Sequence, residues 1–545
     1  MSKVAHYLQE HVVGEVMTGA DARRYFATDG SIFTLIPAIV VYPRSENDVR
    51  KTARFTWQLA ERGRIIPMTP RGLGTDQSGA ALGTGIMMVF PAHMHRILEY
   101  DGKTGDVTVE AGINYGKLQQ TLNTHNRFLP PFPASLEYST VGGAVANNAS
   151  GTHSSKYGST RDYVKRLRFV LANGEVIETR RLNRRELNKK LGLNSMEGEI
   201  YRQLDTLLDE NHDLVTKSSL AVNKNSAGYD LSGIKRKDGS FDITPLIVGS
   251  QGTLGIVSEI TLQSVPHNPL TTLIVAFIDD IPAAQSLLVD LKGLSHPPSA
   301  IEMVDQHLLE FVQAHNPTLL KDIMEPPFQK LALFIEFDDA SDRVQKRMVK
   351  RTVKMLDKHQ AAYKIETNND QKEQLWKVRQ AAATIMAHEE SGAKPLPLIE
   401  DAVVPLERFG EFLESIYGMF AAYHLPVSVW GHAGNANLHV QPLFNLSQVG
   451  DRQKIFKLLD EFYTMVISLG GSTTGEHGDG RLRAPFLEKL YGPDVYAIFA
   501  KVKQIFDPYA TLNPGVKIGV TLDDIKPLVK QEFNLAHLYD HMPNN

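Results

Sequence analysis

"PPFPASLEYSTVGGAVANNASGTHSSKYGSTRDYV", residues 130–164, is a long segment rich in glycine, alanine, serine and asparagine. It lies between two strand-like stretches, "DVTVEAG" (106–112) and "RLRFVLANGEVIE" (166–178). Long segments of this kind inside a compact domain usually carry function. Small residues let a flat ligand lie against the backbone, and the asparagine amides offer hydrogen-bond donors. We therefore expect residues 130–164 to line a binding site rather than to link two domains.

The chain before this segment shows a β-α-β pattern. "AIVVYP" (38–43) is typical of a buried strand, residues 45–63 of a helix opened by Ser45, and "RIIPMTP" (64–70) of another strand. A glycine-rich loop, "PRGLGTDQSGAALG" (70–83), follows directly. It matches neither the dinucleotide pattern G-x-G-x-x-G nor a Walker loop. Two interpretations remain open, a backbone cradle for an anion or a wide turn.

The chain after the segment changes character near residue 266. "LIVGSQGTLGIVSEITL" (246–262) combines a glycine turn with the strand-like Ile256–Val257. "LTTLIVAFIDD" (270–280) and "KLALFIEFDD" (330–339) are strand-like and are separated by amphipathic helical patterns. This order predicts a second, α+β domain.

"VSVWGHAGNANLHVQPL" (427–443) predicts a hairpin in that domain, because alternating apolar residues flank a turn of small residues. The hairpin carries His432 and His439. Residues that face each other across antiparallel strands have Cβ atoms about 4.5–5.5 Å apart, so both imidazoles can reach one metal ion. On these residues alone, two histidines satisfied by backbone groups are an equally good interpretation.

The composition excludes several classes of protein. The 545-residue chain contains 58 Lys and Arg, 62 Asp and Glu, and no cysteine. Its formal net charge of −4 gives no overall field that favours nucleic acid, so we expect no nucleic-acid partner. The lack of cysteine excludes disulfides, thiolate nucleophiles and iron–sulfur clusters. Any redox chemistry therefore requires an organic cofactor or a metal bound without thiolates.

The sequence shows neither a signal-peptide core nor the roughly 18 consecutive apolar residues that span a bilayer. We therefore expect a cytoplasmic protein. "RRLNRRELNKK" (180–190) is the one local exception to the balanced charge. A solvated helix or loop is the first interpretation of this stretch. Contact with an acidic partner or with the inner face of a membrane is the alternative.

Six motifs occur in the order of one known family. They are "PRGLGTDQSG", "STVGGAVANNASGTHSSKYGSTRDYV", "GSQGTLGIVSEIT", "GHAGNANLH", "GEHGDG" and "LNPG". Together they resemble the vanillyl-alcohol-oxidase-type, or PCMH-type, FAD flavoproteins, and within these the D-lactate, glycolate and D-2-hydroxyglutarate dehydrogenases. The resemblance covers roughly residues 20–520 and is specific because six ordered motifs are required together.

The resemblance implies an α+β fold in three parts. Residues 1–265 would form a two-subdomain PCMH-type FAD-binding domain. Residues 266–500 would form an α+β cap domain with an antiparallel sheet, which carries the substrate and the metal. Residues 501–545 would return to the flavin domain.

The resemblance also implies bound FAD, with its pyrophosphate on the first glycine-rich loop and Asn513 near the isoalloxazine. Neither loop centre contains a His, Cys or Tyr that would bond the flavin ring, so we expect FAD to be non-covalent, although His153 lies just beyond the second loop. Turn chemistry is the alternative role for the glycines. The implied cofactor residues are Arg71, Gly72, Leu73, Gly74, Thr75, Ser78, Pro133, Thr140, Gly142, Gly143, Asn147, Ser150, Gly151, Ile256, Val257 and Asn513.

In the resembling family, His-x-Gly-x-x-Asn-x-His and Gly-Glu-His-Gly supply metal ligands, which places His432, His439 and Glu476 here. Two imidazoles and a carboxylate suit zinc or another divalent ion with an open position. By the same resemblance, His477 would act as the base, and Asn437 would lie near the flavin or hold substrate. The sequence departs from the common Asp-Gly turn by having Asn435 and Ala436, and alanine tolerates the left-handed conformation poorly.

Arg379 and Lys394 are spaced like the carboxylate-binding pair of 2-hydroxyglutarate-type enzymes. A guanidinium suits bidentate binding of a carboxylate, and an ordinary surface arginine and loop lysine are the alternative. If both residues bind carboxylates, a dicarboxylate substrate is expected. If only Arg379 does, lactate or glycolate fits better.

The resemblance therefore implies FAD-dependent oxidation of a D-2-hydroxy acid to the 2-oxo acid, by hydride transfer to flavin N5. Long members of the group continue into a cysteine-rich iron–sulfur domain, and this cysteine-free chain would need a separate electron acceptor. The candidates are a quinone, an electron-transfer flavoprotein, an iron–sulfur protein and O2. An oxidase of the same fold and a flavin-free metal-dependent hydrolase or binding protein are the alternatives, and the oligomeric state is not predicted.

Overall fold

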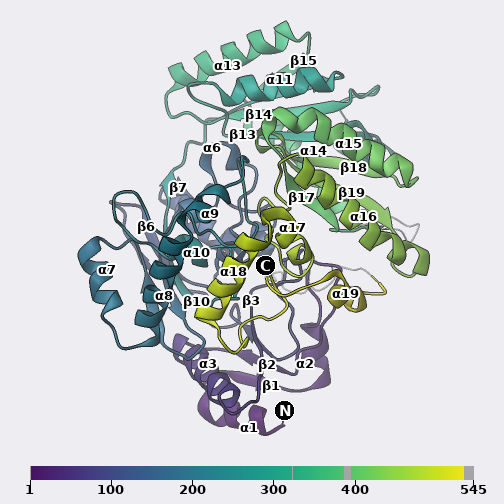
Figure 1. The fold of residues 1–545 in the computed structure, drawn as a ribbon. Helices are drawn as coiled ribbons and strands as arrows, with labels where there is room; N and C mark the ends of the chain where they lie inside the picture. The colour runs from purple at the N-terminus through teal and green to yellow at the C-terminus, as the bar shows by residue number, and fades with distance from the viewer. Residues whose placement is uncertain (1, 322, 386–393, 533–545) are drawn as a thin grey trace.

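The computed structural model describes residues 2–321, 323–385 and 394–532, with only the backbone described for residues 381–385 (Figure 1). The first half of the chain forms the lower and left parts of the molecule in Figure 1. The second half forms the upper right part, and the C-terminal helices return between the two. Helices and antiparallel strands are mixed throughout, which confirms the predicted α+β class.

The N-terminal part contains helices α1 (Ser2–His11) and α2 (Ala20–Tyr25) and a four-stranded sheet. β2 and β3 both run parallel to the central β4, and α3 (Glu46–Ala60) connects β2 to β3, which confirms the β-α-β pattern. In spatial order the strands are β1 (Glu15–Met17), β2 (Ile39–Tyr42), β4 (Ile86–Val89) and β3 (Met68–Arg71).

The start of α3 differs in detail from the prediction. Ser45 occupies the N-cap position, but its side chain makes no capping hydrogen bond. The carboxylate of Asp48 instead accepts hydrogen bonds from the backbone N–H groups of Val13 (2.9 Å), Gly14 (3.0 Å) and Arg44 (2.9 Å). Asp48 thus ties the N-terminal segment to the first turn of the helix.

A five-stranded antiparallel sheet completes the first half of the chain. Its strands, in spatial order, are β5 (Ile97–Tyr100), β6 (Asp106–Glu110), β10 (Ile256–Gln263), β8 (Val164–Val170) and β9 (Val176–Thr179). The strands predicted on both sides of residues 130–164 are therefore present. The short β7 (Arg127–Phe128) pairs with β11 (Val265–Pro266). The helices of this part are α4 (Tyr115–Thr124), α5 (Val141–Asn147), α6 (Ser154–Tyr157), α7 (Arg184–Leu191), α8 (Met196–Glu210), α9 (His212–Lys217) and α10 (Thr244–Ile247).

The cap domain is built on an eight-stranded sheet whose neighbouring strands are antiparallel. The strands, in spatial order, are β15 (Ala362–Glu366), β12 (Thr272–Ile278), β14 (Leu331–Phe337), β13 (Ala300–Asp305), β18 (Val427–His432), β19 (Asn437–Phe444) and β16 (Lys394–Pro395), and β17 (Ile399–Val403) also pairs with β19. The strands predicted at 270–280 and 330–339 are β12 and β14.

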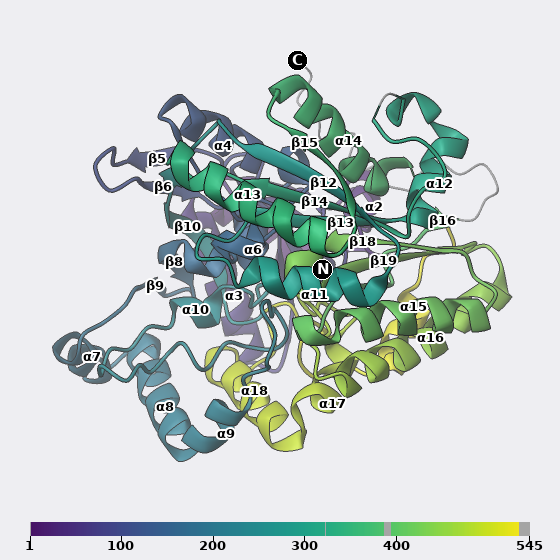
Figure 2. The same cartoon turned by 90° about the horizontal axis from the view of Figure 1, so that it is seen from above.

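Helices cover both faces of the cap sheet (Figure 2). On one face, Ile274 and Ile335 share a core with the helices α11 (Ile281–Lys292), α13 (Asp342–Lys358), α15 (Phe409–Ala422) and α16 (Val449–Ser468). On the other face, Phe334 and Trp430 pack with α12 (Gln306–His315) and α14 (Asn369–Ile385). Alternate residues of each strand point to opposite faces, so the site residues described below share the Trp430 face.

The C-terminal segment contains α17 (Leu487–Tyr491), α18 (Pro493–Phe506) and α19 (Leu522–Ile525). Phe499 and Val502 of α18 belong to the core of the first half, so the chain returns there before the expected boundary at residue 501. Ile525 of α19 packs in the cap core together with Phe33. None of the helices described is both long and apolar enough to cross a membrane.

Candidate active site

The predicted hairpin is present and places both histidines on one face of the cap sheet. His432 ends β18 opposite Asn437, and His439 of β19 is opposite Trp430. The two histidines are therefore diagonal neighbours rather than the directly facing pair expected from the sequence. Their ring centroids are still only 5.3 Å apart. Diagonal neighbours on the same face of two adjacent strands are close enough for long side chains to meet.

The turn between the strands contains a strained alanine. Ala436 is buried and left-handed, with φ 49° and ψ 37°, at the position where the resembling flavoproteins commonly have glycine. Its N–H donates to the carbonyl of Ala433 at 3.0 Å, and its carbonyl accepts from the N–H of Val404 at 3.2 Å. Asn435 is tied to Ser154 Oγ at 2.9 Å. These contacts hold the turn despite the strain.

His432 is held between two buried carboxylates. Its Nδ1 lies 2.7 Å from Glu302 Oε1, and its Nε2 lies 2.9 Å from Glu476 Oε1. Arg379 donates to the other oxygen of Glu302 from Nε at 2.9 Å and from Nη2 at 2.5 Å. Burial favours the neutral acid, but His432 and Arg379 hold the pKa of Glu302 below its ordinary value. Glu302 thus fixes the imidazole with Nε2 toward Glu476.

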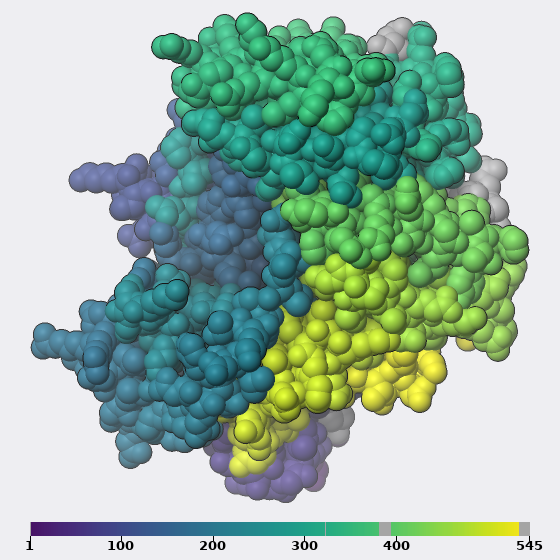
Figure 3. Space-filling view, turned by 45° about the horizontal axis from the view of Figure 1, so that its top comes forward, coloured from purple at the N-terminus to yellow at the C-terminus, as the bar shows by residue number. Residues whose placement is uncertain are grey.

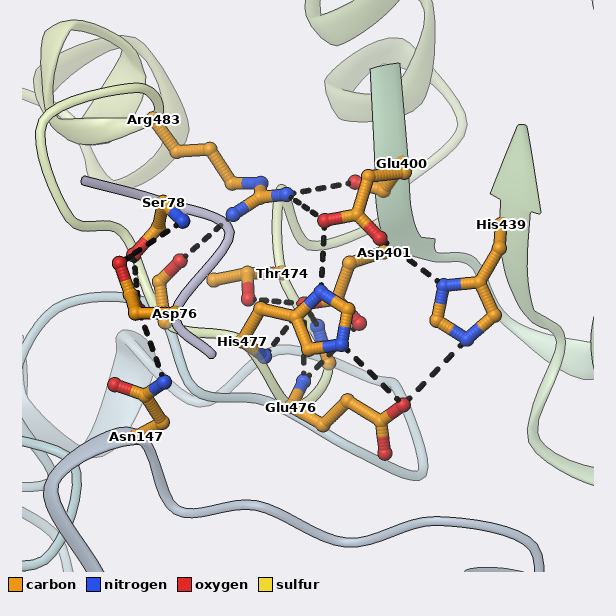
Figure 4. Close-up of polar contacts among 12 residues, drawn as sticks. Asp76, Ser78, Asn147, Glu400, Asp401, His439, Thr474, Glu476, His477 and Arg483 are labelled. Atoms are coloured by element: carbon orange, nitrogen blue, oxygen red, sulfur yellow. Dashed lines mark hydrogen bonds and ion pairs between the residues drawn. The ribbon is translucent and has the colours of Figure 1, made fainter. Parts of the chain in front are cut away.

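Glu400 orients the other two histidines of the site in the same way (Figure 4). Its Oε2 lies 3.1 Å from His439 Nδ1, and its Oε1 lies 2.7 Å from His477 Nδ1. The guanidinium of the fully buried Arg483 also donates to Oε1. Burial opposes ionisation, but His477 and Arg483 hold the pKa of Glu400 well below its ordinary value.

The three imidazoles converge on one oxygen atom. Glu476 Oε1 lies 2.9 Å from Nε2 of His432, 3.5 Å from Nε2 of His439 and 3.8 Å from Nε2 of His477. Burial opposes the imidazolium, but Glu400 and Asp401 raise the pKa of His477 to about 10. Metal-ligating histidines generally have a carboxylate or carbonyl on the other ring nitrogen, as all three have here.

Asp401 shapes the turn that carries Glu476 and His477. Its carboxylate accepts hydrogen bonds from the backbone N–H groups of Gly475 (3.1 Å), Glu476 (3.1 Å) and His477 (2.8 Å), and from Thr474 Oγ1 (2.5 Å). Asp401 groups with His439, Glu476 and His477 within 4.8 Å. Because the N–H groups occupy its oxygens, we assign Asp401 to the turn rather than to a metal.

The second oxygen of Glu476 connects the two domains. Glu476 Oε2 accepts from Ser150 Oγ at 2.6 Å and from the buried Lys224 Nζ at 3.0 Å. Lys224 also donates to Asn437 Oδ1 at 2.8 Å, while Asn437 Nδ2 donates to Asp401 Oδ1 at 3.1 Å. The amide of Asn437 is thus engaged on both sides by the protein. Ser150, expected at the cofactor, contacts the histidine cluster directly.

The first glycine-rich loop keeps free backbone donors next to the second loop. Within the described part of the chain, the N–H groups of Gly72, Leu73 and Thr75 have no hydrogen-bond partner. A Cβ on Gly72 would lie 2.3 Å from Thr140 Oγ1, and a Cβ on Gly142 would lie 2.5 Å from the carbonyl oxygen of Ala111. Gly72 is therefore required where the two loops approach each other, and Gly142 where the second loop packs against the end of β6.

Residues 130–164 contain the short helices α5 and α6, so the segment is less irregular than the composition suggested. Thr140 caps α5 by accepting a hydrogen bond from the N–H of Gly143 at 3.1 Å. Gly151 has φ +123°, and a Cβ there would lie 2.1 Å from the carbonyl oxygen of Phe132, next to Pro133. Within the described residues, Ser139 Oγ and His153 Nδ1 are buried without a partner.

Gln251 connects the loops to the histidine cluster. Its Nε2 lies 2.9 Å from Asn147 Oδ1, 3.2 Å from Ser78 Oγ and 3.2 Å from the carbonyl oxygen of His477. Asn147 in turn donates to Asp76 Oδ1 at 3.0 Å. The two loops and the "GEHGDG" turn are therefore joined by hydrogen bonds through Gln251. Figure 4 shows the contact between Asn147 and Asp76.

The remaining predicted site residues do not contact the histidine cluster directly in the part of the chain that the structure describes. Asn513 donates to the carbonyl oxygens of Ala80 (2.9 Å) and Gln251 (2.8 Å), so the C-terminal segment does reach the first loop. The side chain of Arg71 points inward and donates to the carbonyl oxygens of Thr28 and Ala81, and Gly74 has φ +80°. Ile256 and Val257 begin β10. Lys394 of β16 pairs with Phe444 of β19. Among the described residues, Lys394 makes no contact with Arg379.

Sequence reasoning missed six residues that position the site. Glu400 and Asp401 lie in "LIEDAVVP", and Gln251 lies in "GSQGTLG". These stretches could have identified the three residues. Glu302 is the one glutamate in the buried strand "AIEMVD", which is a usable signal, because an ionised residue in such a strand needs a partner. Lys224 and Arg483 gave no comparable signal.

Two regions of the chain match known families. Residues 37–180 match the FAD binding domain, and residues 268–516 match the C-terminal domain of FAD linked oxidases. The matched regions include the first loop and α5 on one side, and the three histidines with Glu302, Glu400 and Glu476 on the other.

Curated relatives are similar over most of this chain. D-2-hydroxyglutarate dehydrogenase of Escherichia coli is 30% identical over 525 residues, covering 93% of this chain and 50% of the relative. The Pantoea ananatis enzyme of the same name is 29% identical over 544 residues, covering 97% and 52%. This chain thus spans about half the length of these relatives. The glycolate oxidase subunit GlcD of Bacillus subtilis is 29% identical over 484 residues, covering 88% of each chain.

Solved structures share the fold at low sequence identity. 4-Ethylphenol oxidase from Gulosibacter chungangensis superposes with a TM-score of 0.65 at 16% identity, covering 96% of this chain and 98% of that chain. An alkyldihydroxyacetonephosphate synthase gives a TM-score of 0.63 at 16% identity, covering 94% and 84%. At this identity the likeness concerns the fold alone.

Proposed function

We propose that this chain, which matches the FAD binding domain over residues 37–180 and the C-terminal domain of FAD linked oxidases over residues 268–516, oxidises a D-2-hydroxy acid to the 2-oxo acid with bound FAD and a divalent metal ion. The observation that carries this proposal is the convergence of three imidazole Nε2 atoms on Glu476 Oε1, directly against the two glycine-rich loops. A flavin site alone would not need this cluster.

The loops fit a flavin dinucleotide. Three closely spaced backbone N–H groups, those of Gly72, Leu73 and Thr75, have no partner among the described residues and suit a pyrophosphate. Bound FAD would supply the acceptor for the hydride that leaves the substrate. Residues 71–75 and 78 would hold the pyrophosphate side, with the second loop, Ile256–Val257 and Asn513 around the rest.

The histidine cluster fits a divalent ion. His432, His439 and Glu476 would be the ligands, since nitrogen and carboxylate donors suit zinc, our first candidate, and other divalent ions. Their side chains are 7%, 4% and 8% exposed, whereas His477 is 24% exposed and is therefore the most accessible to substrate. A bound ion would acidify the hydroxyl of a chelating substrate. Without the ion, Glu400 and Asp401 favour the protonated ring of His477. A bound divalent cation would oppose them and favour the neutral ring, which would then take the hydroxyl proton at Nε2.

The substrate class follows from the cations near this centre. Arg379 lies 4.6 Å above the Trp430 ring and is already paired with Glu302, so only part of its guanidinium is left for a substrate carboxylate. Lys394 is half-buried. We propose a 2-hydroxy acid with one or two carboxylates. D-2-Hydroxyglutarate is the first compound to test, because two of the relatives reported above carry its name.

We expect D-2-hydroxy acids to bleach the flavin absorbance near about 450 nm under anaerobic conditions. D-2-Hydroxyglutarate, D-lactate and glycolate form the panel, with the L-enantiomers of the chiral acids as matched controls. The D-acid should react at least about 10²-fold faster, because misplacing the reacting C–H by about 1 Å costs that much. If no acid of the panel bleaches the flavin, the proposal is wrong. Rapid reoxidation by O2 would identify an oxidase rather than a dehydrogenase.

We expect the FAD to be released intact by acid precipitation, leaving a colourless pellet and a yellow supernatant. His153, which lies just beyond the centre of the second loop, is the first candidate for a covalent bond to the ring. Its Nε2 lies 3.4 Å from Glu336 Oε1, and its ring centroid lies 5.3 Å from that of Phe132. A yellow pellet that becomes colourless in the His153→Ala variant would show a covalent flavin instead.

The electron acceptor and the cellular location remain proposals. We propose that a separate acceptor, such as a quinone, an electron-transfer flavoprotein or an iron–sulfur protein, reoxidises the flavin, because the chain has no cysteine for a cluster of its own. A cytoplasmic protein, with peripheral contact at the inner face of a membrane, is consistent with this need.

A further inference from the structure

The solvent-facing side of α13 is strongly basic, although the chain as a whole has a formal net charge of −4. The helix carries seven cationic and two acidic side chains. All seven cations are exposed. They are Arg343, Lys346, Arg347, Lys350, Arg351, Lys354 and Lys358. The sequence analysis had singled out only residues 180–190 as basic, so this second stretch is a correction.

The seven cations form one continuous face. The buried residues of α13 are Gln345, Met348, Thr352 and Leu356. At about 100° per residue, the cations fall within an arc of roughly 140° centred opposite these buried residues. The helix therefore presents an apolar side to the cap core and a cationic side to solvent.

The charge of this face is only partly offset by the protein, although the exposed Asp357 falls within the same arc. Within the described residues, Lys346 alone among the seven has a carboxylate partner, Asp342 at 2.8 Å. The basic stretch at α7 is different, because Arg180 pairs with Glu186 at 2.8 Å and Lys190 pairs with Glu197 at 2.5 Å. The α13 face therefore carries a net positive field outward, whereas that of α7 is partly cancelled.

α13 lies at the outer edge of the cap, at the end of the molecule opposite the N-terminus (Figures 1 and 3). Met348 packs on the same side of the cap sheet as Ile274, and the opposite side carries Trp430. Two exposed apolar side chains adjoin the helix. Leu270 is 74% exposed, and its backbone carbonyl accepts a hydrogen bond from Gln345 Nε2 at 3.1 Å. Ile365 is 41% exposed and lies in the edge strand β15.

We propose that the cationic face of α13 binds the anionic headgroups of a phospholipid membrane and holds the protein peripherally at that surface. A row of Lys and Arg side chains on one long helix, six of the seven without a carboxylate partner among the described residues, complements a flat, negatively charged surface. A protein that accepts electrons from the flavin is a poorer occupant. The cap sheet lies between α13 and the face that carries His432 and His439, so such a partner would dock away from the site.

The test is co-sedimentation of the full chain with vesicles of phosphatidylcholine containing 30% phosphatidylglycerol. We expect binding at low salt that is lost with pure phosphatidylcholine and in about 0.5 M NaCl, since salt screens exposed charges. The variant Lys350→Gln/Arg351→Gln/Lys354→Gln should bind at least 10-fold more weakly. The matched control Arg184→Gln/Arg185→Gln/Lys189→Gln removes the same charge from α7 and should bind like the wild type.

Thermal unfolding and turnover with a soluble dye acceptor check that both variants are folded. The substituted side chains are exposed, and among the described residues no hydrogen bond or ion pair joins them to the proposed active site, so neither measurement should change. Equal weakening of the two variants, binding to neutral vesicles, or binding that survives high salt would overturn the proposal. So would retention of duplex DNA or of an acidic protein without retention of vesicles. Because dye turnover is measured separately, these outcomes leave the proposed oxidation unaffected.

Discussion

His477→Asn is expected to slow anaerobic reduction of the flavin by the best D-2-hydroxy acid by about 10²–10⁴-fold. Glu400 fixes the His477 ring at 2.7 Å from Nδ1, which leaves Nε2 facing the cluster on its most exposed side. An asparagine keeps a donor for Glu400 and the backbone bonds to Asp401, but it provides no atom that takes a proton. Stopped-flow measurement at matched FAD and metal content gives the rate.

The matched control for this prediction is His212→Asn, the same substitution at a histidine whose side chain is 78% exposed. It should reduce at the wild-type rate. A His477→Asn rate close to wild type would remove His477 from the reaction. The proton would then have to leave through another group of the site, and the proposed oxidation itself would still be tested by bleaching.

Loss of the divalent ion is expected to lower flavin reduction by about 10³-fold, because polarisation by a bound cation contributes several kcal/mol to the reaction. Chelation and the variant His439→Ala should both produce this loss. His439 Nε2 lies 3.5 Å from Glu476 Oε1, and its removal takes away one of the three proposed ligands. Elemental analysis should find about one ion per chain in the wild type and almost none in the variant.

FAD content is the internal control for this prediction, because the glycine-rich loops do not contain His439 and should still hold the cofactor. His315→Ala, at an exposed position of α12, is the matched substitution and should retain the ion. Restoration of activity by re-adding the metal to the chelated wild type, but not to His439→Ala, would complete the case. Full activity in protein shown to be metal-free would reduce the cluster to a structural role.

The sequence alone predicted the elements whose pattern is local. Alternating apolar residues around a small-residue turn predicted the hairpin of β18 and β19, and the β-α-β order of β2, α3 and β3 followed from periodicity. The short helices α5 and α6 were missed. Their glycine, serine and asparagine residues have low helix propensity, and contacts such as the Thr140 cap and the close approach to Gly72 stabilise α5.

The sequence predicted those residues of the candidate site that lie in its motifs. The spacing of His432 and His439, and the adjacent Glu476 and His477, placed four residues that the structure brings together. The residues that orient them lie elsewhere in the chain. Glu302 is 130 positions from His432, and Lys224 is 252 positions from Glu476. No local pattern connects such pairs. The contact of Glu302 with His432 depends on the pairing of β13 with β18, and that of Lys224 with Glu476 depends on how the first half of the chain packs against the cap.

For the charged residues, too, the sequence determined one part and the tertiary structure another. The sequence determined which residues are charged, and it placed the metal-binding residue types at a recognisable spacing. Tertiary structure alone decided that Glu302 neutralises Arg379 and that Glu400 serves two imidazoles. It also decided that cations of the α7 stretch pair with carboxylates, whereas six of the seven α13 cations have no carboxylate partner among the described residues. The physical reason is that an electrostatic interaction depends on distance and burial, and folding sets both between residues far apart in the chain.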